Sequence, residues 1–314
     1  MTGMIQQAAE GLLTLLALLI PAGSLTCWVV ALRRRRRTGQ LLAWEERRPV
    51  PWEAVDLGLI LLLAFVMTVV VQLVFSQWSG VPLATDVAQL PPDQRLGFVV
   101  ASFVASLAIL ALVLAVVRLR AGAGARDLGL RRDKVMDDLR LGVVAFLLLA
   151  SPVFLIQFGL THRYPTRHPL VKFLQADPDP RLYAAAFVAA VCVAPLVEEW
   201  LFRVLLQGWL EKLAAWWPAA LHVSPIVNEP GEEVPGATNA ALRPAWWPIA
   251  VSALLFALAH YSHGPDPIPL FVLALGLGYL YRQTHRLLPC VVVHLLVNLT
   301  TMLQLWVLTQ QRSM

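Results

Sequence analysis

The feature that most constrains this chain is its division into apolar blocks of about 20 residues, separated by short polar stretches. A helix of this length spans the roughly 30 Å hydrocarbon layer of a bilayer. Hydrophobic residues make up 58% of the chain and charged residues only 14%, whereas soluble domains average about 45–50% and 25%. The sequence therefore predicts an all-α fold, a polytopic transmembrane helical bundle.

We count about eight spans in the 314 residues. They cover approximately residues 11–32, 55–75, 97–117, 139–160, 182–217, 246–261, 269–281 and 287–308. Residues 1–150 are expected to hold spans one to three and the start of span four, with basic cytoplasmic loops. Residues 183–308 are expected to form a second unit, with a Pro-rich, mobile cytoplasmic insert at 218–245.

The basic residues lie beside the spans, so the net charge of +5 does not indicate nucleic-acid binding. Arg33 to Arg37 follow the first span, a second basic stretch occupies residues 118–134, and Arg282 and Arg286 lie between the last two spans. Alternation of the spans puts all three on one face, which the positive-inside rule assigns to the cytoplasm. We therefore expect a multi-pass protein of the plasma (cytoplasmic) membrane with its N-terminus outside.

Within the apolar cores of the spans, charged residues and histidines occur only in the second half of the chain, apart from Arg140 at the edge of span four. They are Glu198, Glu199 and Arg203 in span five, His260 in span six and His294 in span eight, where Asn298 follows four residues later. An ionisable residue within hydrocarbon costs at least about 2.5–3.5 kcal/mol, so such residues usually face a bundle interior or a wet cavity and act there.

Helical spacing separates the two glutamates. Glu199 and Arg203 are four residues apart and can pair on one helix face. Glu198 is turned about 100° away from Glu199, which leaves it without an intrahelical partner and makes it the candidate reactive carboxylate. Phe256 and His260 share the same four-residue spacing, so three helices each present such a pair. Two histidines, an asparagine and a glutamate that converge inside a membrane are typical of a hydrolytic site.

Two chemistries fit these residues. Glu198, His260 and His294 could ligate zinc, which activates a bound water. Alternatively, without a metal, Glu198 and His260 together take a proton from water as the general base, and His294 and Asn298 stabilise the oxyanion. A serine route through Ser252 is less favoured, because no Asp lies within the apolar core of any span to orient a histidine.

The predicted membrane depths of Glu198, His260 and His294 do not all agree. Glu198 and His294 both fall in the cytoplasmic half. His260 lies about 14 residues from Trp246, roughly 21 Å from the inside, which is too far out. Tilt, a helix start near Pro248 or a kink at Pro195 would close the difference.

Three motifs in this order resemble a known family. EEWLFR (Glu198 to Arg203), FALAH (Phe256 to His260) and HLLVN (His294 to Asn298) are similar to the EExxxR, FxxxH and HxxxN motifs of the CPBP family, also called Abi. That family contains CAAX prenyl proteases and bacteriocin-processing or bacteriocin-immunity proteins. The resemblance covers about residues 183–305.

The resemblance implies an intramembrane endopeptidase in which Glu198 and His260 activate water. It implies that His294 and Asn298 hold the oxyanion or help to bind zinc, and that Arg203 is structural. Glu199 and Phe256 would support the site. The implied partners are the lipid bilayer and a membrane protein, a lipidated protein or a peptide as substrate, with no nucleic acid.

Two further functions stay open from the sequence. A non-catalytic scaffold or bacteriocin-immunity protein would share the fold. A proton-coupled transporter would use Glu198 and His260 as a relay, although we find no internal repeat of the kind many transporters show.

Several other polar or small residues are expected to have no chemical role. We expect Cys27, Cys192 and Cys290 to pack, because they have no metal-ligand spacing. Gly276 and Gly278 are expected to serve helix packing. His222, His263 and His285 lie in a loop or at span ends, where we expect them to be solvated.

Overall fold

The computed structural model describes residues 2–46, 49–82, 89–164, 171, 174, 179–221 and 245–312. These residues form helices and connections without a strand, so the predicted all-α bundle is confirmed. The first four long helices are α1 (Thr2–Thr38), α2 (Ala54–Ser79), α3 (Pro92–Leu119) and α4 (Val135–Thr161). The short turn η2 (Arg132–Lys134) precedes α4. The predicted boundary at residue 150 falls inside α4.

One continuous helical rod follows, in which α-helical and π-helical segments alternate. It consists of α6 (Pro180–Phe187), η3 (Val188–Val193), α7 (Ala194–Glu199), η4 (Trp200–Gln207) and α8 (Gly208–Leu221). The segments η3 and η4 are π-helical: the N–H of Ala194 reaches back five residues to the Ala189 carbonyl, and that of Gly208 reaches the Arg203 carbonyl. Such wide turns are rare and often mark functional sites.

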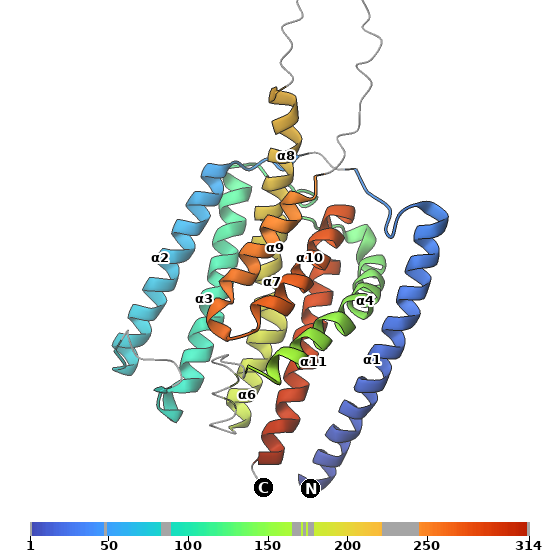
Figure 1. Ribbon diagram of the computed structural model, residues 1–314. Helices are drawn as coiled ribbons and strands as arrows, with labels where there is room; N and C mark the ends of the chain where they lie inside the picture. The colour runs from blue at the N-terminus through green and yellow to red at the C-terminus, as the bar shows by residue number, and fades with distance from the viewer. Residues whose placement is uncertain are drawn as a thin grey trace, which may run out of the picture.

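The remaining helices are α9 (Trp247–Ala259), the short turn η5 (Tyr261–His263), α10 (Pro267–Thr284) and α11 (Leu287–Arg312). In Figure 1, α9 descends obliquely from the upper end of the bundle, the chain turns near mid-height, and α10 returns upward beside it. The predicted insert at 218–245 lies outside the described residues, except that residues 218–221 continue α8 and residue 245 precedes α9.

Six helices are long and apolar enough to cross a membrane. They correspond to predicted spans one to five and eight. The other two predicted spans are α9 and α10, which form the helical hairpin of Figure 1. With 13 residues, α9 is about 20 Å long, too short for a hydrocarbon layer of about 30 Å.

The three basic connections lie at one end of the bundle, as the alternation of spans predicts. The N–H of Glu45, after α1, donates to the Gln283 carbonyl at 2.8 Å, and that of Leu287 donates to the Gly129 carbonyl at 3.0 Å. These two bonds join the connections that follow α1, α3 and α10. Both chain termini lie at the opposite end (Figure 1).

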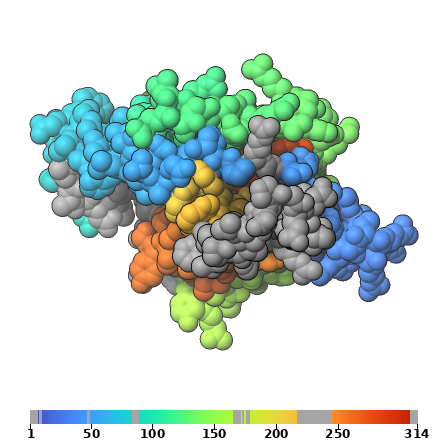
Figure 2. Space-filling model, turned by 90° about the horizontal axis from the view of Figure 1, so that it is seen from above, coloured from blue at the N-terminus to red at the C-terminus, as the bar shows by residue number. Residues whose placement is uncertain are grey.

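The main apolar core lies between α3, α4, the middle of the rod, α10 and α11. Helices α4 and α11 approach closely at Gly142, where an added Cβ would lie 2.6 Å from Val292. Gly276 and Gly278 likewise face Leu149 and Ile249, which agrees with the packing role predicted for them. Seen from the end of the bundle, α2 and α1 project from opposite sides of this core (Figure 2).

The connection between α1 and α2, of which residues 39–46 and 49–53 are described, joins the rod to the rest of the basic end. Trp52 is fully buried, and its Nε1–H donates to the Leu205 carbonyl at 3.1 Å. Lys212 of α8 donates to the Trp52 carbonyl at 3.1 Å and pairs with Glu53 at 2.5 Å. At the other end of the connection, Glu45 pairs with Arg286 at 3.0 Å.

Candidate active site

The predicted site residues come from three elements that are far apart in sequence. Glu198 and Glu199 end α7, between the two π-helical segments. His260 caps the C-terminal end of α9 at the turn of the hairpin, and His294 and Asn298 lie one helical turn apart on α11. The oblique path of α9 resolves the depth disagreement, because it brings His260 within 3.9 Å of Glu198.

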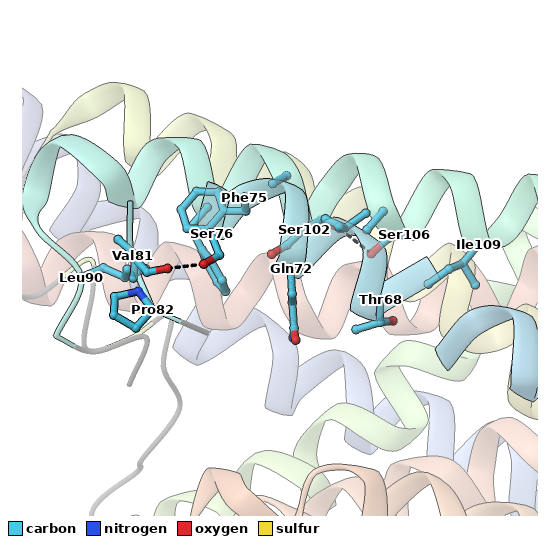
Figure 3. A pocket seen from close by; sticks show the side chains of 14 residues that line it. Thr68, Gln72, Phe75, Ser76, Val81, Pro82, Leu90, Ser102, Ser106 and Ile109 are labelled. Carbon is cyan, nitrogen blue, oxygen red and sulfur yellow. Dashed lines mark hydrogen bonds between the residues drawn. The ribbon is translucent and has the colours of Figure 1, made fainter. Parts of the chain in front are cut away.

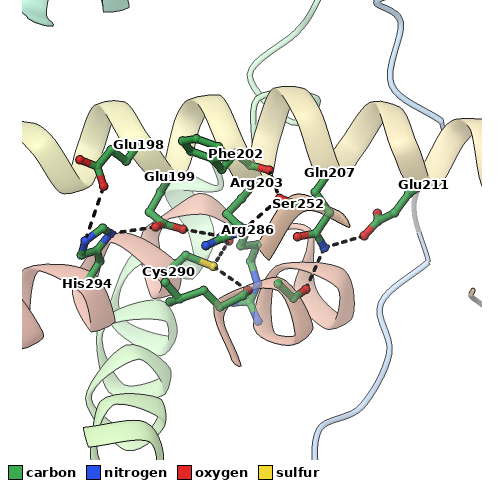
Figure 4. Close-up of polar contacts among 12 residues, drawn as sticks. Glu198, Glu199, Phe202, Arg203, Gln207, Glu211, Ser252, Arg286, Cys290 and His294 are labelled. Carbon is green, nitrogen blue, oxygen red and sulfur yellow. Dashed lines mark hydrogen bonds and ion pairs between the residues drawn. The ribbon is translucent and has the colours of Figure 1, made fainter. Parts of the chain in front are cut away.

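Glu199 is the buried anchor of the site. Its Oε2 accepts from Arg203 Nε at 3.0 Å, and both side chains are fully buried. Its Oε1 lies 2.9 Å from His294 Nδ1. The predicted four-residue pair with Arg203 therefore forms, and the same carboxylate also orients a histidine of another helix. Figure 4 shows this chain of contacts running from His294 through Glu199 to Arg203.

Arg203 continues the network to α9. Its NH1 donates to the Ser252 hydroxyl at 3.2 Å, and that hydroxyl donates to the Phe202 carbonyl at 2.8 Å. Ser252 is thus part of the support for Arg203, an arrangement that does not resemble a serine nucleophile held by a histidine. This support was missed by the sequence analysis, because nothing in the spacing shows that α9 reaches Arg203.

Glu198 faces away from that network, toward two imidazoles. Its Oε2 lies 3.9 Å from His260 Nε2 and 3.8 Å from His294 Nε2. The Glu198 side chain is 25% exposed and that of His260 is 17% exposed, whereas that of His294 is only 3% exposed. Glu198 and His260 are therefore the members of the group that solvent or a substrate can reach.

Hydrogen bonds on the far side of each ring define the histidine tautomers. His260 Nδ1 lies 2.8 Å from the Phe256 carbonyl. A carbonyl only accepts, so Nδ1 carries a hydrogen, and Nε2 is the ring nitrogen that faces Glu198. His294 Nδ1 faces the Glu199 carboxylate in the same way.

Phe256 holds the two histidines apart and in place. Its ring is fully buried, with its centroid 4.9 Å from that of His260 and 5.8 Å from that of His294. The guanidinium carbon of Arg203 lies 5.2 Å from the same centroid. Phe256 thus supports the site by packing, while its backbone carbonyl orients His260.

Asn298 lies against a different part of the rod. Its Nδ2 donates to the Ala190 carbonyl at 2.8 Å, in the first π-helical segment. One of its two amide hydrogens is therefore engaged with the backbone, and the other is the one left for an oxyanion.

The donor atoms of the site suit a zinc ion, but they lie farther apart than the ligands of a bound zinc. Two imidazole Nε2 atoms, on rings whose Nδ1 atoms are hydrogen-bonded, and a carboxylate form a zinc-type ligand set. Neighbouring ligands about 2.0–2.1 Å from a tetrahedral zinc lie roughly 3.3 Å apart, closer than the 3.8 and 3.9 Å found here. Among the residues that the structure describes, no group of three or more His, Cys, Asp or Glu side chains is placed to hold a metal ion.

Two histidines expected to be solvated are partly buried instead. His285 pairs with Glu211 at 3.3 Å. The His263 ring lies 5.4 Å from that of His260, centroid to centroid, and burial, with a smaller effect of His260, lowers the pKa of His263 below its usual range. The hairpin places both near other helices, which a sequence cannot show. His222 lies outside the described residues. Of the cysteines, Cys290 is buried as expected, whereas Cys192 is exposed.

A separate hollow of about 300 Å³ lies between α2 and α3. Its apolar wall carries a row of polar side chains, among them Thr68, Gln72, Ser102 and Ser106 (Figure 3). None of the predicted site residues lines it.

Comparison with known proteins bears on the second half of the chain. Residues 180–229 and 230–300 match a family model described as type II CAAX prenyl endopeptidase Rce1-like. No curated protein and no solved structure matches the chain. The matched ranges include Glu198, His260, His294 and Asn298, together with the helices that carry them. Through residues 180–300, the chain is therefore similar to type II CAAX prenyl endopeptidases, which supports the resemblance to the CPBP family.

Proposed function

We propose that this protein is an intramembrane endopeptidase that hydrolyses peptide bonds of membrane-associated proteins or peptides, with water activated by Glu198 and His260. The observation that carries the proposal is the position of the Glu198 carboxylate, 3.9 and 3.8 Å from the Nε2 atoms of His260 and His294. These gaps are too long for direct hydrogen bonds. A single water about 2.8 Å from both partners would bridge such a gap.

The proposed reaction starts from that bridging water. Glu198 and His260 take one proton from it, and its oxygen attacks the carbonyl carbon of the scissile peptide bond. The tetrahedral oxyanion receives hydrogen bonds from His294 Nε2 and from the second Asn298 amide hydrogen. The accepted proton then passes to the leaving nitrogen as the C–N bond breaks, giving one carboxylate and one amine.

Glu199 has a defined part in this scheme. His294 donates to an oxyanion from Nε2 only when both of its ring nitrogens are protonated, because Nδ1–H is committed to Glu199. The Glu199 carboxylate favours that doubly protonated ring, and Arg203 keeps the carboxylate ionised within the bundle. The two adjacent glutamates therefore have opposite tasks, one reacting and the other holding a charge in place.

Cleavage of a quenched-fluorescent peptide library by the purified protein in detergent tests the proposal. Wild type should cleave and Glu198→Gln should not. Glu46→Gln is the matched control, because it makes the same chemical change at an exposed residue of the α1–α2 connection and should leave the rate unchanged. Equal turnover by wild type and Glu198→Gln would remove Glu198 from the mechanism.

A chelator arm in the same assay separates the two chemistries. Cleavage that resists a strong chelator supports the mechanism without a metal. Loss on chelation, with recovery on adding zinc, supports the alternative in which Glu198, His260 and His294 hold zinc to activate the water.

A further inference from the structure

The first wide turn in the rod has a cause that is visible in the sequence. Pro195 lies inside the rod, has no N–H and would press its ring against the carbonyl four residues before it in an ordinary α-helix. The chain widens at Val188–Val193, directly before Pro195. Glu198 and Glu199 follow Pro195 by three and four residues, about one turn.

Proline also leaves one carbonyl of this turn without its backbone donor. In the π-helical register, the N–H of Ala194 bonds to the Ala189 carbonyl. The next bond in that register would join residue 195 to the Ala190 carbonyl, and Pro195 has no hydrogen to donate. A carbonyl left unpaired away from water costs free energy comparable to a lost hydrogen bond.

Asn298 supplies the missing donor. Its Nδ2 donates to the Ala190 carbonyl at 2.8 Å. On the same face of α11, one turn earlier, His294 meets Glu199. Helix α11 is therefore fastened to the rod on both sides of Pro195, once at the wide turn and once at the carboxylates.

We propose that Asn298 is a positioning residue, which fixes the wide turn before Glu198 by replacing the backbone donor that Pro195 lacks. Its effect on catalysis rests on the proposed function, whereas its effect on the turn does not. An asparagine that acts only on the oxyanion would be indifferent to residue 195. An asparagine that acts through the turn depends on the proline.

This dependence gives a test by second-site rescue. Asn298→Leu keeps the approximate size of the side chain and removes both amide hydrogens. Pro195→Ala restores an N–H that can serve the Ala190 carbonyl. The four proteins, wild type, each single variant and the double variant, are compared in detergent by thermal unfolding and by kcat and KM on a peptide that wild type cleaves.

Asn298→Leu should lower Tm and reduce kcat at least tenfold with little change in KM in the wild-type background. In the Pro195→Ala background, the same substitution should lower Tm and kcat much less. Equal losses of Tm and kcat in the two backgrounds would overturn the proposal. Rescue of Tm without rescue of kcat would overturn the positioning of Glu198 while leaving the bond to the turn intact.

Two features of the design keep the outcomes distinct. If no peptide is cleaved by wild type, the proposed function fails, but the Tm comparison still decides whether Asn298 serves the turn. If Pro195→Ala does not fold, hydrogen exchange of a peptide covering residues 188–199 decides instead. Asn298→Leu should raise exchange there relative to α3, and unchanged exchange would contradict the proposal.

Discussion

At the scale of single residues, the two adjacent glutamates lie in different surroundings. Glu199 is fully buried between Arg203 and His294, whereas Glu198 is partly exposed and faces two imidazole Nε2 atoms. Helical spacing was sufficient to predict the Glu199–Arg203 pair and the different direction of Glu198. It was insufficient to predict that His294 meets both carboxylates, because that contact joins helices 95 residues apart in sequence.

Substitution of the two glutamates should therefore separate stability from activity. Glu199→Gln leaves the Arg203 guanidinium buried without its counter-charge, and breaking a buried pair of this kind costs about 3–5 kcal/mol. Glu198→Gln should abolish cleavage with little change in stability, since its carboxylate lies 3.8 and 3.9 Å from its two histidine partners, beyond direct hydrogen-bond distance. Unfolding in detergent and the cleavage rate measure the two effects. A Glu199→Gln protein as stable as wild type, or a Glu198→Gln protein that is the less stable of the two, would contradict this assignment.

At the scale of elements, the rod that contains the glutamates is held in position by hydrogen-bond donors from other parts of the chain. Asn298 donates to the first wide turn, Ser252 to the second at Phe202, and Trp52 to the Leu205 carbonyl. A kink at Pro195 was one of three alternatives that the sequence left open, and the predicted sixth span began at Trp246, one residue before α9. The donors could not be predicted, because a proline shows where a helix loses a backbone hydrogen bond but not which side chain donates in its place.

The α1–α2 connection should contribute to stability through Trp52. Trp52→Ala removes a fully buried ring, for which the expected loss is about 3–5 kcal/mol. Trp52→Phe keeps most of the packing and loses the bond to Leu205, for about 1 kcal/mol. Trp44 on the same connection is 44% exposed, so Trp44→Phe is the matched control and should change stability by at most about 0.5 kcal/mol. Chemical unfolding in detergent that does not distinguish Trp52→Ala from Trp44→Phe would rule out this anchoring role.

At the scale of the whole molecule, hydropathy predicted the polytopic helical bundle, and the expected eight or so spans compare with six long apolar helices and the shorter apolar helix α9 among the described residues. A hairpin that enters and leaves through one face is as apolar as two spans, and only its length and packing reveal it. The turn between α9 and α10 lies near mid-height of the bundle (Figure 1), and His260 caps α9 at the start of that turn. Six candidate spans among the described residues place both termini at the same end of the bundle, as eight spans would.

The orientation of this bundle is a separate prediction. The positive-inside rule places the end with Arg33 to Arg37 in the cytoplasm and both termini outside. An alkaline phosphatase, which is active only outside, should be active when fused after residue 314 in a bacterial host. The same enzyme fused after residue 38 should be inactive. The opposite pattern would reverse the orientation.

The central claim is that Glu198 and His260 act together on one water, and a double-mutant cycle on kcat tests it most directly. Residues that act as a unit give strongly non-additive losses. On a peptide that wild type cleaves, Glu198→Gln combined with His260→Ala should be about as slow as the slower single variant. If the two losses multiply instead, the residues act independently, and the shared activation of water is wrong.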